Sequence, residues 1–465
     1  MAMPGQQAQT VAVPKRLPLV LAPENRDDST SKDAKIVNAY MEKGDDGEYH
    51  LYKRPGLSTY QTKTGNGYGV FNWQGNLYNV TGTTLYKNGT SLGTVDATGG
   101  VYRFSSTLGG THQLVLGNGA AAYTYDNTTL AAIPDADFPA AFVKGWAYLD
   151  GTTYVMDASA NIQGSDINNP TSWDAGNVIT AQIEPDAGVA LAKQLVYVIA
   201  LKQWSTEVFY DAYNPAGTPL GRVQGAKVNH GCVSAETVQS IDGMLIWTST
   251  TKEGSVQVIL MNNLKADIVS TKPIERLLES AAWTSGIYSW VLKLNGHGFY
   301  GVTNTAGNFT LVFDLRERLW YQFADTNEAY WPIVSACSLL PSQHVMQHAT
   351  NGKLYLASHD YYNDDSSLFT VDLVTPNFDG GVRRRKQLNL LEFIADQTSG
   401  SVLEVRCSDD DYRSWSNFRE VDLSKKRPQL SNNGTFSKRA YNLRHRRNTS
   451  LRMQAVEMQI DLGTL

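Results

Sequence analysis

The sequence has few charged residues and very few cysteines. Asp, Glu, Lys and Arg make up 18% of the 465 residues, below the share of about a quarter that is usual for soluble proteins. The three cysteines, Cys232, Cys337 and Cys407, are widely separated and form no Cys-x-x-Cys pair. We therefore expect neither a disulfide framework nor a thiolate zinc site, and we expect synthesis in a reducing compartment.

Long hydrophobic runs are also missing. The best early apolar run, Leu17 to Ala22, is interrupted by Pro18, and no signal peptide can be read in the N-terminal region. No stretch approaches the ~20 apolar residues that a membrane helix needs. We therefore expect no membrane anchor.

Glycine and tyrosine, in contrast, are abundant, with 39 and 24 residues. Together with low charge and many Thr and Asn residues, they are typical of short strands and tight turns. This composition argues against a coiled coil, a helical bundle and a disordered chain. From Gly65 onward, short apolar runs are closed by dipeptides that favour two-residue hairpin turns. Examples are Asn88-Gly89, Asp150-Gly151, Asp242-Gly243 and Asn351-Gly352.

The hairpin units recur at roughly 30 to 50 residues, which is the spacing of β-propeller blades with one four-stranded sheet each. We predict an all-β fold, with an extended N-terminal arm, a β-propeller of about six blades and a C-terminal antiparallel β module. The arm spans residues 1–64 and includes one strand at Ile36–Tyr40. The propeller body spans 65–380 with an insertion around 186–290, and the basic module spans 381–465.

One short helix is expected in the insertion. Apolar residues recur with helical spacing from Ile274 to Ala282, and Pro273 stands in the first turn, where its missing N–H costs nothing. Glu275 lies near the positive end of the helix dipole. A helix in a propeller is an insertion or a blade connector, and we expect it to mark a contact surface.

Basic residues are concentrated near the end of the sequence. Residues 381–465 hold 16 Lys and Arg against 10 Asp and Glu, whereas the remainder holds 24 against 35. An acidic body with a basic end favours a polyanion or an acidic protein surface as partner, and the alternative is a solvated basic face. The candidate interaction residues are Arg383, Arg384, Arg385, Lys386, Arg444, Arg446 and Arg447.

Two motifs match catalytic or metal-binding patterns only in part. Gly89-Thr90-Ser91-Leu92-Gly93 matches the G-x-S-x-G nucleophile elbow, but a polar strand follows it where the elbow needs a helix. His344 and His348 have the four-residue spacing of zinc ligands on a helix, but the local pattern is strand-to-turn and no glutamate lies between them. We interpret both motifs as hairpin residues.

Ser408-Asp409-Asp410-Asp411-Tyr412-Arg413-Ser414-Trp415 resembles the Asp-box turn, with Tyr412 where glycine is usual. The motif is a fold element of hairpins, so we interpret it as a structural turn. A sialidase would need three arginines from different blades, and the adjacent Arg383 to Arg385 cannot converge because neighbours on a strand point to opposite faces. We predict no enzyme, and no catalytic, cofactor-binding or metal-binding residues.

The densest resemblance to a known family lies between Trp204 and Glu275, and further matches lie near both ends. The matching segments are Trp204-Ser-Thr-Glu207-Val-Phe209-Tyr210, Pro219-Leu220-Gly221-Arg222, Asp242-Gly243-Met-Leu-Ile-Trp247, Ile268 to Glu275, Lys53-Arg54-Pro55-Gly56-Leu57, the Asp-box-like turn and Met453 to Ile460. In this order they resemble the packaged-DNA stabilization, or tail hub (nozzle), proteins of short-tailed bacteriophages. The resemblance covers most of the chain from about Ala34.

The resemblance implies a structural β-propeller protein that forms a homohexameric ring below the head-to-tail adaptor protein. Such a ring extends the DNA channel, helps retain packaged DNA, and carries tail fibre or spike proteins and the tail needle or tip protein. Genomic double-stranded DNA would contact it transiently in the lumen. The protein would be made in the host bacterial cytoplasm and end in the tail of the virion.

Two other classes of function stay open at this level. One is a propeller glycan-binding or sialidase-like protein, which would show convergent Arg, Tyr and carboxylate side chains in a propeller mouth. The other is a basic-tailed nucleic-acid binder, which would show a steep salt dependence of affinity. For the basic clusters, we expect binding to the adaptor or a neighbouring subunit in preference to DNA, because arginine pairs carboxylates in a bidentate way.

Overall fold

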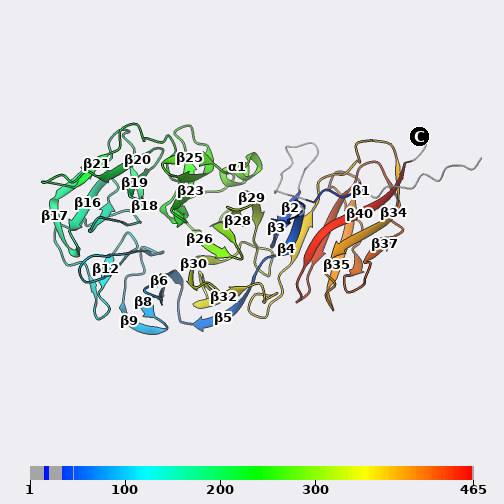
Figure 1. The fold of residues 1–465 in the computed structure, drawn as a ribbon, viewed down its shortest axis with the longest axis horizontal. Helices are drawn as coiled ribbons and strands as arrows, with labels where there is room; N and C mark the ends of the chain where they lie inside the picture. The colour runs from blue at the N-terminus through cyan, green and yellow to red at the C-terminus, as the bar shows by residue number, and fades with distance from the viewer. Residues whose placement is uncertain (1–14, 20–33, 46, 463–465) are drawn as a thin grey trace, which may run out of the picture. The chain divides into compact units, whose positions relative to one another are not determined.

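The computed structural model describes residues 15–19, 34–45 and 47–462, and it contains 53% strand and 3% helix. It confirms the predicted all-β propeller with one α-helix. The chain divides into two compact units (Figure 1). The propeller unit comprises 56–318 and 329–361, and the second unit comprises 1–55, 319–328 and 362–465. The parts of the predicted arm at 1–14 and 20–33 lie outside the described residues.

The propeller unit contains six antiparallel sheets of four strands. They are β6 (Gly67–Trp73), β7 (Asn76–Thr81), β8 (Thr84–Lys87) and β9 (Thr90–Thr94); β10 (Arg103–Ser106), β11 (Leu114–Gly117), β12 (Ala122–Tyr125) and β13 (Leu130–Ala132); β14 (Ala147–Leu149), β15 (Thr152–Met156), β16 (Asn161–Asp166) and β17 (Asn169–Thr180); β18 (Gly188–Gln194), β19 (Tyr197–Lys202), β20 (Thr206–Asp211) and β21 (Leu220–Arg222); β22 (Gln239–Ile241), β23 (Met244–Thr250), β24 (Val256–Asn262) and β25 (Lys265–Ile268); and β30 (Ile333–Leu340), β31 (Gln343–His348), β32 (Lys353–Ser358) and β5 (Gly56–Thr62).

These six sheets agree with the predicted number of about six blades. Strands β26 (Ile287–Leu294), β27 (His297–Asn304) and β28 (Phe309–Asp314) occupy one further position in the ring, because β26 contacts both β22 and β30. The first strands of neighbouring sheets contact one another around most of the ring, β18 contacts β23 of the next sheet, and β30 contacts β6 to complete the ring. β5 closes the last sheet by pairing with β32, so the beginning and the end of the propeller share one sheet.

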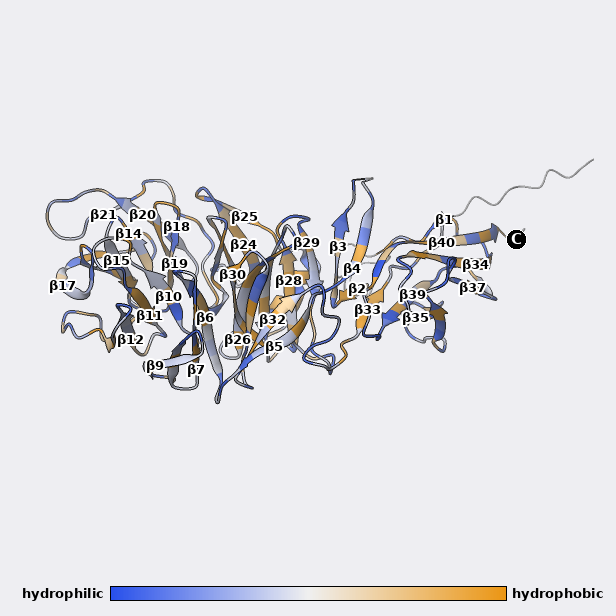
Figure 2. Cartoon of the chain, turned by 60° about the horizontal axis from the view of Figure 1, so that its bottom comes forward, coloured by the Kyte–Doolittle hydropathy of each residue, from blue (hydrophilic) through white to orange (hydrophobic). Residues whose placement is uncertain are grey.

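Three of the four hairpin dipeptides form the turns that the sequence predicted, whereas Asn351 has no positive φ and the loop that contains it, 349–352, has four residues. Asn88 and Gly89 have φ angles of 48° and 85°, and Asp242 and Gly243 have 52° and 73°. Positive φ at both central residues is the geometry of a type I′ turn, which matches the twist of the paired strands. Much of the apolar sequence lies on strands such as β24, β28 and β30, while the loops are largely hydrophilic (Figure 2).

The predicted helix is present as α1 (Lys272–Glu279), three residues shorter than its apolar pattern suggested. Pro273 lies in its first turn, and Ile274 and Leu278 are buried on the side that contacts β24. α1 connects β25 to β26, and a 3-10 helix, η1 (Ala235–Thr237), precedes β22. The expected insertion around 186–290 is corrected: β18–β21 and β22–β25 are regular blades, and only α1 interrupts the pattern of strands.

The second unit is built from two sheets of strands that are distant in sequence. The first has the order β3-β4-β40-β34-β37, with β1 paired to β40 and β38 to β34, and within this unit the second has the order β29-β2-β33-β39-β35-β36. The strands are β1 (Lys15–Arg16), β2 (Lys35–Val37), β3 (Ala39–Lys43), β4 (Tyr49–Lys53), β29 (Leu319–Gln322), β33 (Val371–Val374), β34 (Lys386–Ala395), β35 (Val402–Ser408), β36 (Arg419–Asp422), β37 (Gln429–Ser431), β38 (Thr435–Phe436), β39 (Ala440–His445) and β40 (Arg452–Leu462).

These units differ from the sequence-based division at residues 64 and 380. The described parts of the expected N-terminal arm pack into sheets of their own chain, because β4 and β1 pair with β40 near the other end of the sequence. The expected single strand at Ile36–Tyr40 is interrupted at Asn38, whose φ of 58° separates β2 from β3. Asn38 takes this conformation with its side-chain oxygen accepting hydrogen bonds from Arg54 Nε and Ala324 N–H, both at 2.8 Å.

Candidate functional site

The centre of the propeller ring contains two cavities that follow one another along the first strands of the sheets. The first, of about 580 Å³, is lined by the later parts of β6, β18 and β30. The second, of about 520 Å³, is lined by residues at or before the starts of β6 and β26. Lys144 lines both cavities, so they meet at this side chain.

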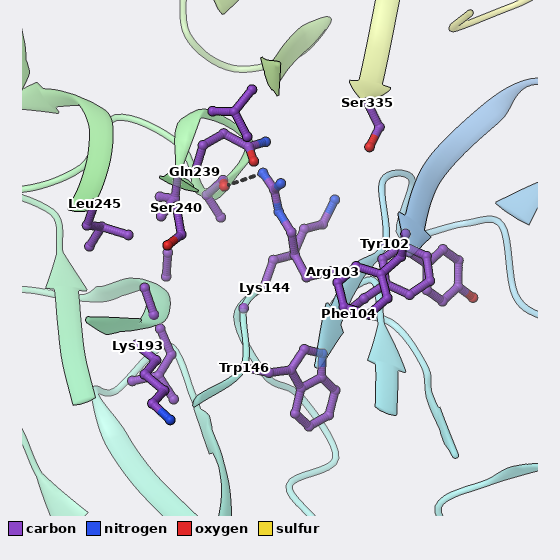
Figure 3. Close-up of a pocket in the computed structure, with 18 of the residues that line it drawn as sticks. Tyr102, Arg103, Phe104, Lys144, Trp146, Lys193, Gln239, Ser240, Leu245 and Ser335 are labelled. Carbon is purple, nitrogen blue, oxygen red and sulfur yellow. Dashed lines mark hydrogen bonds between the residues drawn. The ribbon is translucent and has the colours of Figure 1, made fainter. Parts of the chain in front are cut away.

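An ionic cluster occupies the place where the two cavities meet. Lys144 forms a salt bridge to Glu236, and Arg103 Nη2 lies 3.5 Å from the other carboxylate oxygen of Glu236. Arg103 also donates a hydrogen bond of 2.8 Å to the carbonyl oxygen of Ala235 (Figure 3). These residues come from β10, the segment before β14, and η1, so the cluster joins separate blades across the ring.

The ionic cluster fills the axis of the propeller. Its three side chains are only 17% to 18% exposed, and they stand between the two cavities. A DNA duplex, which is wider than its major groove of about 12 Å, cannot pass along an axis that is occupied by side chains of three blades. The propeller of one subunit therefore cannot itself serve as a DNA channel.

The candidate basic residues near 383 lie in the second unit and differ from one another in exposure. Arg383, Arg384 and Arg385 are exposed, and Arg385 Nε donates a hydrogen bond of 3.0 Å to Thr435 Oγ1. Lys386 is 1% exposed, and its ammonium group donates to the carbonyl oxygens of Arg384 and Ser437 at 2.9 Å. Burial lowers the pKa of Lys386. The structure thus buries Lys386 inside its own unit.

The candidates near 444 pair with carboxylates of the same unit. Arg444 Nε lies 3.1 Å from Asp372 Oδ1, Arg446 Nε lies 3.8 Å from Glu404 Oε2, and Arg447 Nη2 lies 3.6 Å from Glu420 Oε1. The second unit as a whole has 24 Lys and Arg and 24 Asp and Glu. The basic excess of 381–465 is therefore balanced within the unit, and among the candidate residues Arg383 to Arg385 form the exposed basic run that carries no salt bridge in the described structure.

His445 lies between these arginines in the sequence. Its burial leads us to expect that the folded protein loses stability in acid. It is fully buried, and its Nε2 atom lies 3.1 Å from Ser401 Oγ and 3.2 Å from Thr449 Oγ1. Burial, with the nearby charges of Lys53 and Arg447, lowers its pKa to about 3. The folded protein thus keeps His445 neutral, whereas the unfolded chain binds a proton below pH ~6.5.

We therefore expect the stability from this group to be complete above pH ~6.5 and to fall by up to about 1.4 kcal/mol per pH unit as the pH decreases toward 3. Urea unfolding between pH 7 and 4.5 measures this slope. His445→Gln cannot be protonated and should show a shallower acid loss than the wild type, whereas His112→Gln, at an exposed position, should keep the wild-type slope. Equal slopes for the wild type and His445→Gln would contradict the assignment.

A buried charge network in blade β18–β21 was missed by sequence reasoning. Lys202 Nζ lies 2.8 Å from both Asp186 Oδ1 and Glu207 Oε1, and all three side chains are 0% exposed. Glu207 Oε2 is also 3.1 Å from Arg222 Nε. Glu207 and Arg222 belong to segments that carried the family resemblance, so their spacing was the available signal. The network stabilises the blade, and Asp186 also lines a cavity of about 370 Å³.

The two partial catalytic or metal-binding motifs are strand residues. Ser91 is exposed on β9, and a loop follows this strand where the nucleophile elbow needs a helix. His344 and His348 both lie on β31, where four residues span about 13 Å, too far apart for one metal ion. His344 Nδ1 lies 2.8 Å from Ser338 Oγ. Among the described residues, no cluster of His, Cys, Asp or Glu could hold a metal ion.

The Asp-box-like segment is a structural turn. Asp410 Oδ1 accepts hydrogen bonds from Ser408 Oγ and Ser414 N–H at 2.9 Å. The hydrogen bonds from Ser414 are the main reason that the pKa of Asp410 is lowered to about 2. Tyr412, where glycine is usual, has a φ of 66°, and its hydroxyl donates a hydrogen bond of 3.0 Å to the carbonyl oxygen of Thr375. Tyr412 thus adopts a positive φ that usually favours glycine, and its side chain is buried.

No helix among the described residues has both the length and the apolar character that crossing a bilayer requires.

Comparison with protein families gives one match. Residues 34–354 match the family model described as "Bacteriophage P22 Gp10, beta-propeller", whose members stabilise packaged DNA. The match covers more than half of the chain. It reaches all six four-stranded sheets of the propeller unit and ends at residue 354, near the start of β32. A comparison with curated protein sequences gave no significant match.

Solved structures show only a distant likeness. The N-terminal domain of Nup159 is 9% identical, with 70% of this chain and 99% of that chain covered and a TM-score of 0.39. The extracellular domain of the putative one-component system BT4673 from B. thetaiotaomicron is 10% identical, with 85% and 59% covered and a TM-score of 0.43. U3-55K is 11% identical, with 65% and 98% covered and a TM-score of 0.39.

Proposed function

Because the chain belongs to the bacteriophage family of β-propeller proteins that stabilise packaged DNA, we propose that it is the tail hub, or nozzle, of a short-tailed phage. The family consists of structural proteins of the virion, which favours a non-enzymatic role. In the proposed role, several copies extend the DNA channel below the head-to-tail adaptor and help retain the genome. The family match over 34–354 is the observation that carries this proposal.

Because side chains occupy the axis of the propeller, we propose that the DNA channel is formed between subunits. Since the cluster of Arg103, Lys144 and Glu236 occupies the centre of the ring of blades, DNA must pass outside each propeller. A contact that repeats head to tail and closes by rotation encloses a lumen of this kind. We propose a homohexameric ring, with the adaptor on one side and the tail fibre or spike and the needle or tip proteins as further partners.

The exposed run Arg383 to Arg385 is the basic surface that we propose for docking to the adaptor or a neighbouring subunit. Arg383 and Arg384 are exposed, and the pairs that hold Arg444, Arg446 and Arg447 are internal to the unit. Exposed arginines can form bidentate pairs with carboxylates of another protein. Weak, transient contact with duplex DNA in the lumen is the secondary role.

The experiment that tests the proposal combines the purified chain with capsids that carry the adaptor but lack this protein. We expect electron microscopy to show one ring of six copies below the adaptor. Arg383→Gln with Arg384→Gln should weaken docking about tenfold or more, because charge-assisted contacts across an interface are lost. Lys425→Gln with Lys426→Gln removes the same charge from exposed residues of the same unit and should have little effect.

Two results would count against the proposal. Monomers that never form rings, with or without adaptor-bearing capsids, would contradict the hub assignment. Unchanged docking of the Arg383 and Arg384 variant, together with a salt-steep DNA affinity that the same substitutions abolish, would favour the nucleic-acid binder. The sialidase-like alternative has no supporting observation, because the first axial cavity is lined by a single arginine, Arg103, and by no described carboxylate.

A further inference from the structure

The first axial cavity has a charge opposite to that of the unit around it. The propeller unit holds 16 Lys and Arg against 21 Asp and Glu. The residues that line the cavity nevertheless include Arg103, Lys144 and Lys193, and the described lining contains no Asp or Glu. Glu236, the carboxylate of the ionic cluster, lines only the second cavity. Glu236 offsets part of the charge of Arg103 and Lys144, so the three basic residues keep a net positive charge, and the described lining supplies no carboxylate of its own.

Lys193 is the basic residue of the cavity that the ionic cluster does not hold. It lies on β18 and is half-buried, with its ammonium group 6.0 Å from the ring centre of Tyr148. Among the described residues, no carboxylate lies within salt-bridge distance of its ammonium group. Burial lowers the pKa of Lys193, while the charge of Asp150 opposes this shift. An incoming anion would stabilise the charged form of this amine.

Aromatic and apolar groups complete the wall of the first cavity. Figure 3 shows Arg103 and Lys144 in the middle, with Phe104 on one side and Gln239 on the other. Trp146 also lines the cavity, and its indole N–H is buried without a hydrogen-bond partner in the described structure. The cavity thus offers cationic groups and apolar walls, which is the composition of a binding pocket with a few oriented polar groups.

The propeller face around this cavity carries exposed apolar side chains. In each antiparallel sheet the first and third strands end at the same face, so the turns after them share that face. Six large exposed apolar residues lie at these turns: Leu108, Ile167, Leu195, Val196, Tyr213 and Leu340, with exposed fractions between 51% and 79%. On the opposite face, the turns between second and third strands carry none among the described residues, while the end of the fourth strand β25 and the connection after the fourth strand β17 carry Ile268 and Ile183, which are 49% and 44% exposed.

We infer that this face of the propeller is a docking surface for a partner protein that inserts an acidic peptide segment into the first axial cavity. The carboxylates of the segment pair with Lys193 and approach Arg103 and Lys144, and its flanking apolar residues pack on the exposed apolar turns. The apolar rim favours a protein over a nucleic acid, since interfaces with nucleic acid are more polar and much more basic. The inference does not require the proposed ring, because it concerns a single subunit.

The test uses the full chain and a random dodecapeptide display library as the probe. We expect the selected peptides to contain Asp or Glu next to Leu, Ile or Phe. The best peptide is then synthesised with a fluorescent label, and its dissociation constant is measured by anisotropy. Lys193→Gln should raise this constant about tenfold, the loss of one partly desolvated charge pair, without changing the melting temperature.

A matched lysine controls for net charge. Lys293 lies on β26 and pairs with Asp242 at 2.5 Å outside the cavity, so Lys293→Gln should leave peptide affinity unchanged. Selected peptides without acidic residues, a failure to select any peptide, or affinity that is insensitive to Lys193→Gln would overturn the inference. Displacement of the peptide by a thymidine dodecanucleotide at similar concentration would also overturn it, in favour of a nucleic-acid site.

Discussion

We expect Lys202→Met to lower the free energy of unfolding of the propeller unit by about 3–5 kcal/mol, because it leaves buried carboxylates without their cation. Lys202 lies between Asp186 and Glu207, and its ammonium group also donates to the carbonyl oxygen of Glu184 at 2.7 Å. Burial alone would raise the pKa of Asp186, but hydrogen bonds from Lys202, Trp204 N–H and Ser205 hold it below its usual value. Methionine fills similar space and supplies no charge.

Lys265→Met is the matched control for this prediction. Lys265 also forms a salt bridge, 3.0 Å from Asp267, but its side chain is 78% exposed. Exposed pairs contribute about 0–1 kcal/mol, so the control should unfold almost like the wild type. Urea unfolding of the three proteins, followed by tryptophan fluorescence, measures the difference. Equal stability of the two variants would show that the buried network does not stabilise the blade.

We expect Arg54→Lys to destabilise the second unit by about 2–4 kcal/mol. The guanidinium group of Arg54 donates to both carboxylate oxygens of Asp364 at 3.0 and 2.6 Å, and it lies 3.7 Å from the ring centre of Phe369. It also donates to Asn38 Oδ1 and to the carbonyl oxygen of Ala324. The side chain is 0% exposed. Lysine keeps the charge but cannot supply this planar set of donors, so acceptors stay buried and unpaired.

Arg427→Lys tests whether burial, and not the bidentate geometry, sets this effect. Arg427 also forms a bidentate pair, with Glu392 at 2.8 and 2.6 Å, but its side chain is 64% exposed. We expect a loss below about 1 kcal/mol for this variant. Hydrogen exchange of the amides in β2, β3 and β33 reports the stability near Arg54. A loss for Arg427→Lys as large as for Arg54→Lys would contradict the explanation.

These two sites show what some charged residues of the matching segments do in the folded protein. Arg54 belongs to Lys53-Arg54-Pro55-Gly56-Leu57, while Glu207 and Arg222 belong to two separate matching segments. Their partners Asp364 and Lys202 lie outside those motifs. The resemblance could place these residues in segments that match the family in a fixed order. It could not show that they are buried ion pairs, because burial depends on segments that approach only after folding.

For the basic clusters, too, the sequence could not show which residues are buried or paired. Local charge density indicated Arg383 to Lys386 and Arg444 to Arg447 equally, yet the structure exposes the first three residues, buries Lys386 and pairs Arg444 with Asp372. The axial cavity was not visible in the sequence at all. Arg103, Lys144 and Lys193 are isolated basic residues, and they line one cavity only because three different blades bring them to the ring centre.

The sequence by itself determined the class of fold, the hairpins and the helix, because these depend on residues a few positions apart. Asn-Gly and Asp-Gly pairs favour positive φ wherever they occur, and alternating apolar residues favour strands. Only the tertiary structure decided which strands close each sheet. β5 joins β32 and β4 joins β40, pairings that connect residues hundreds of positions apart. Such pairings depend on how complete apolar faces pack together, and no local pattern encodes that choice.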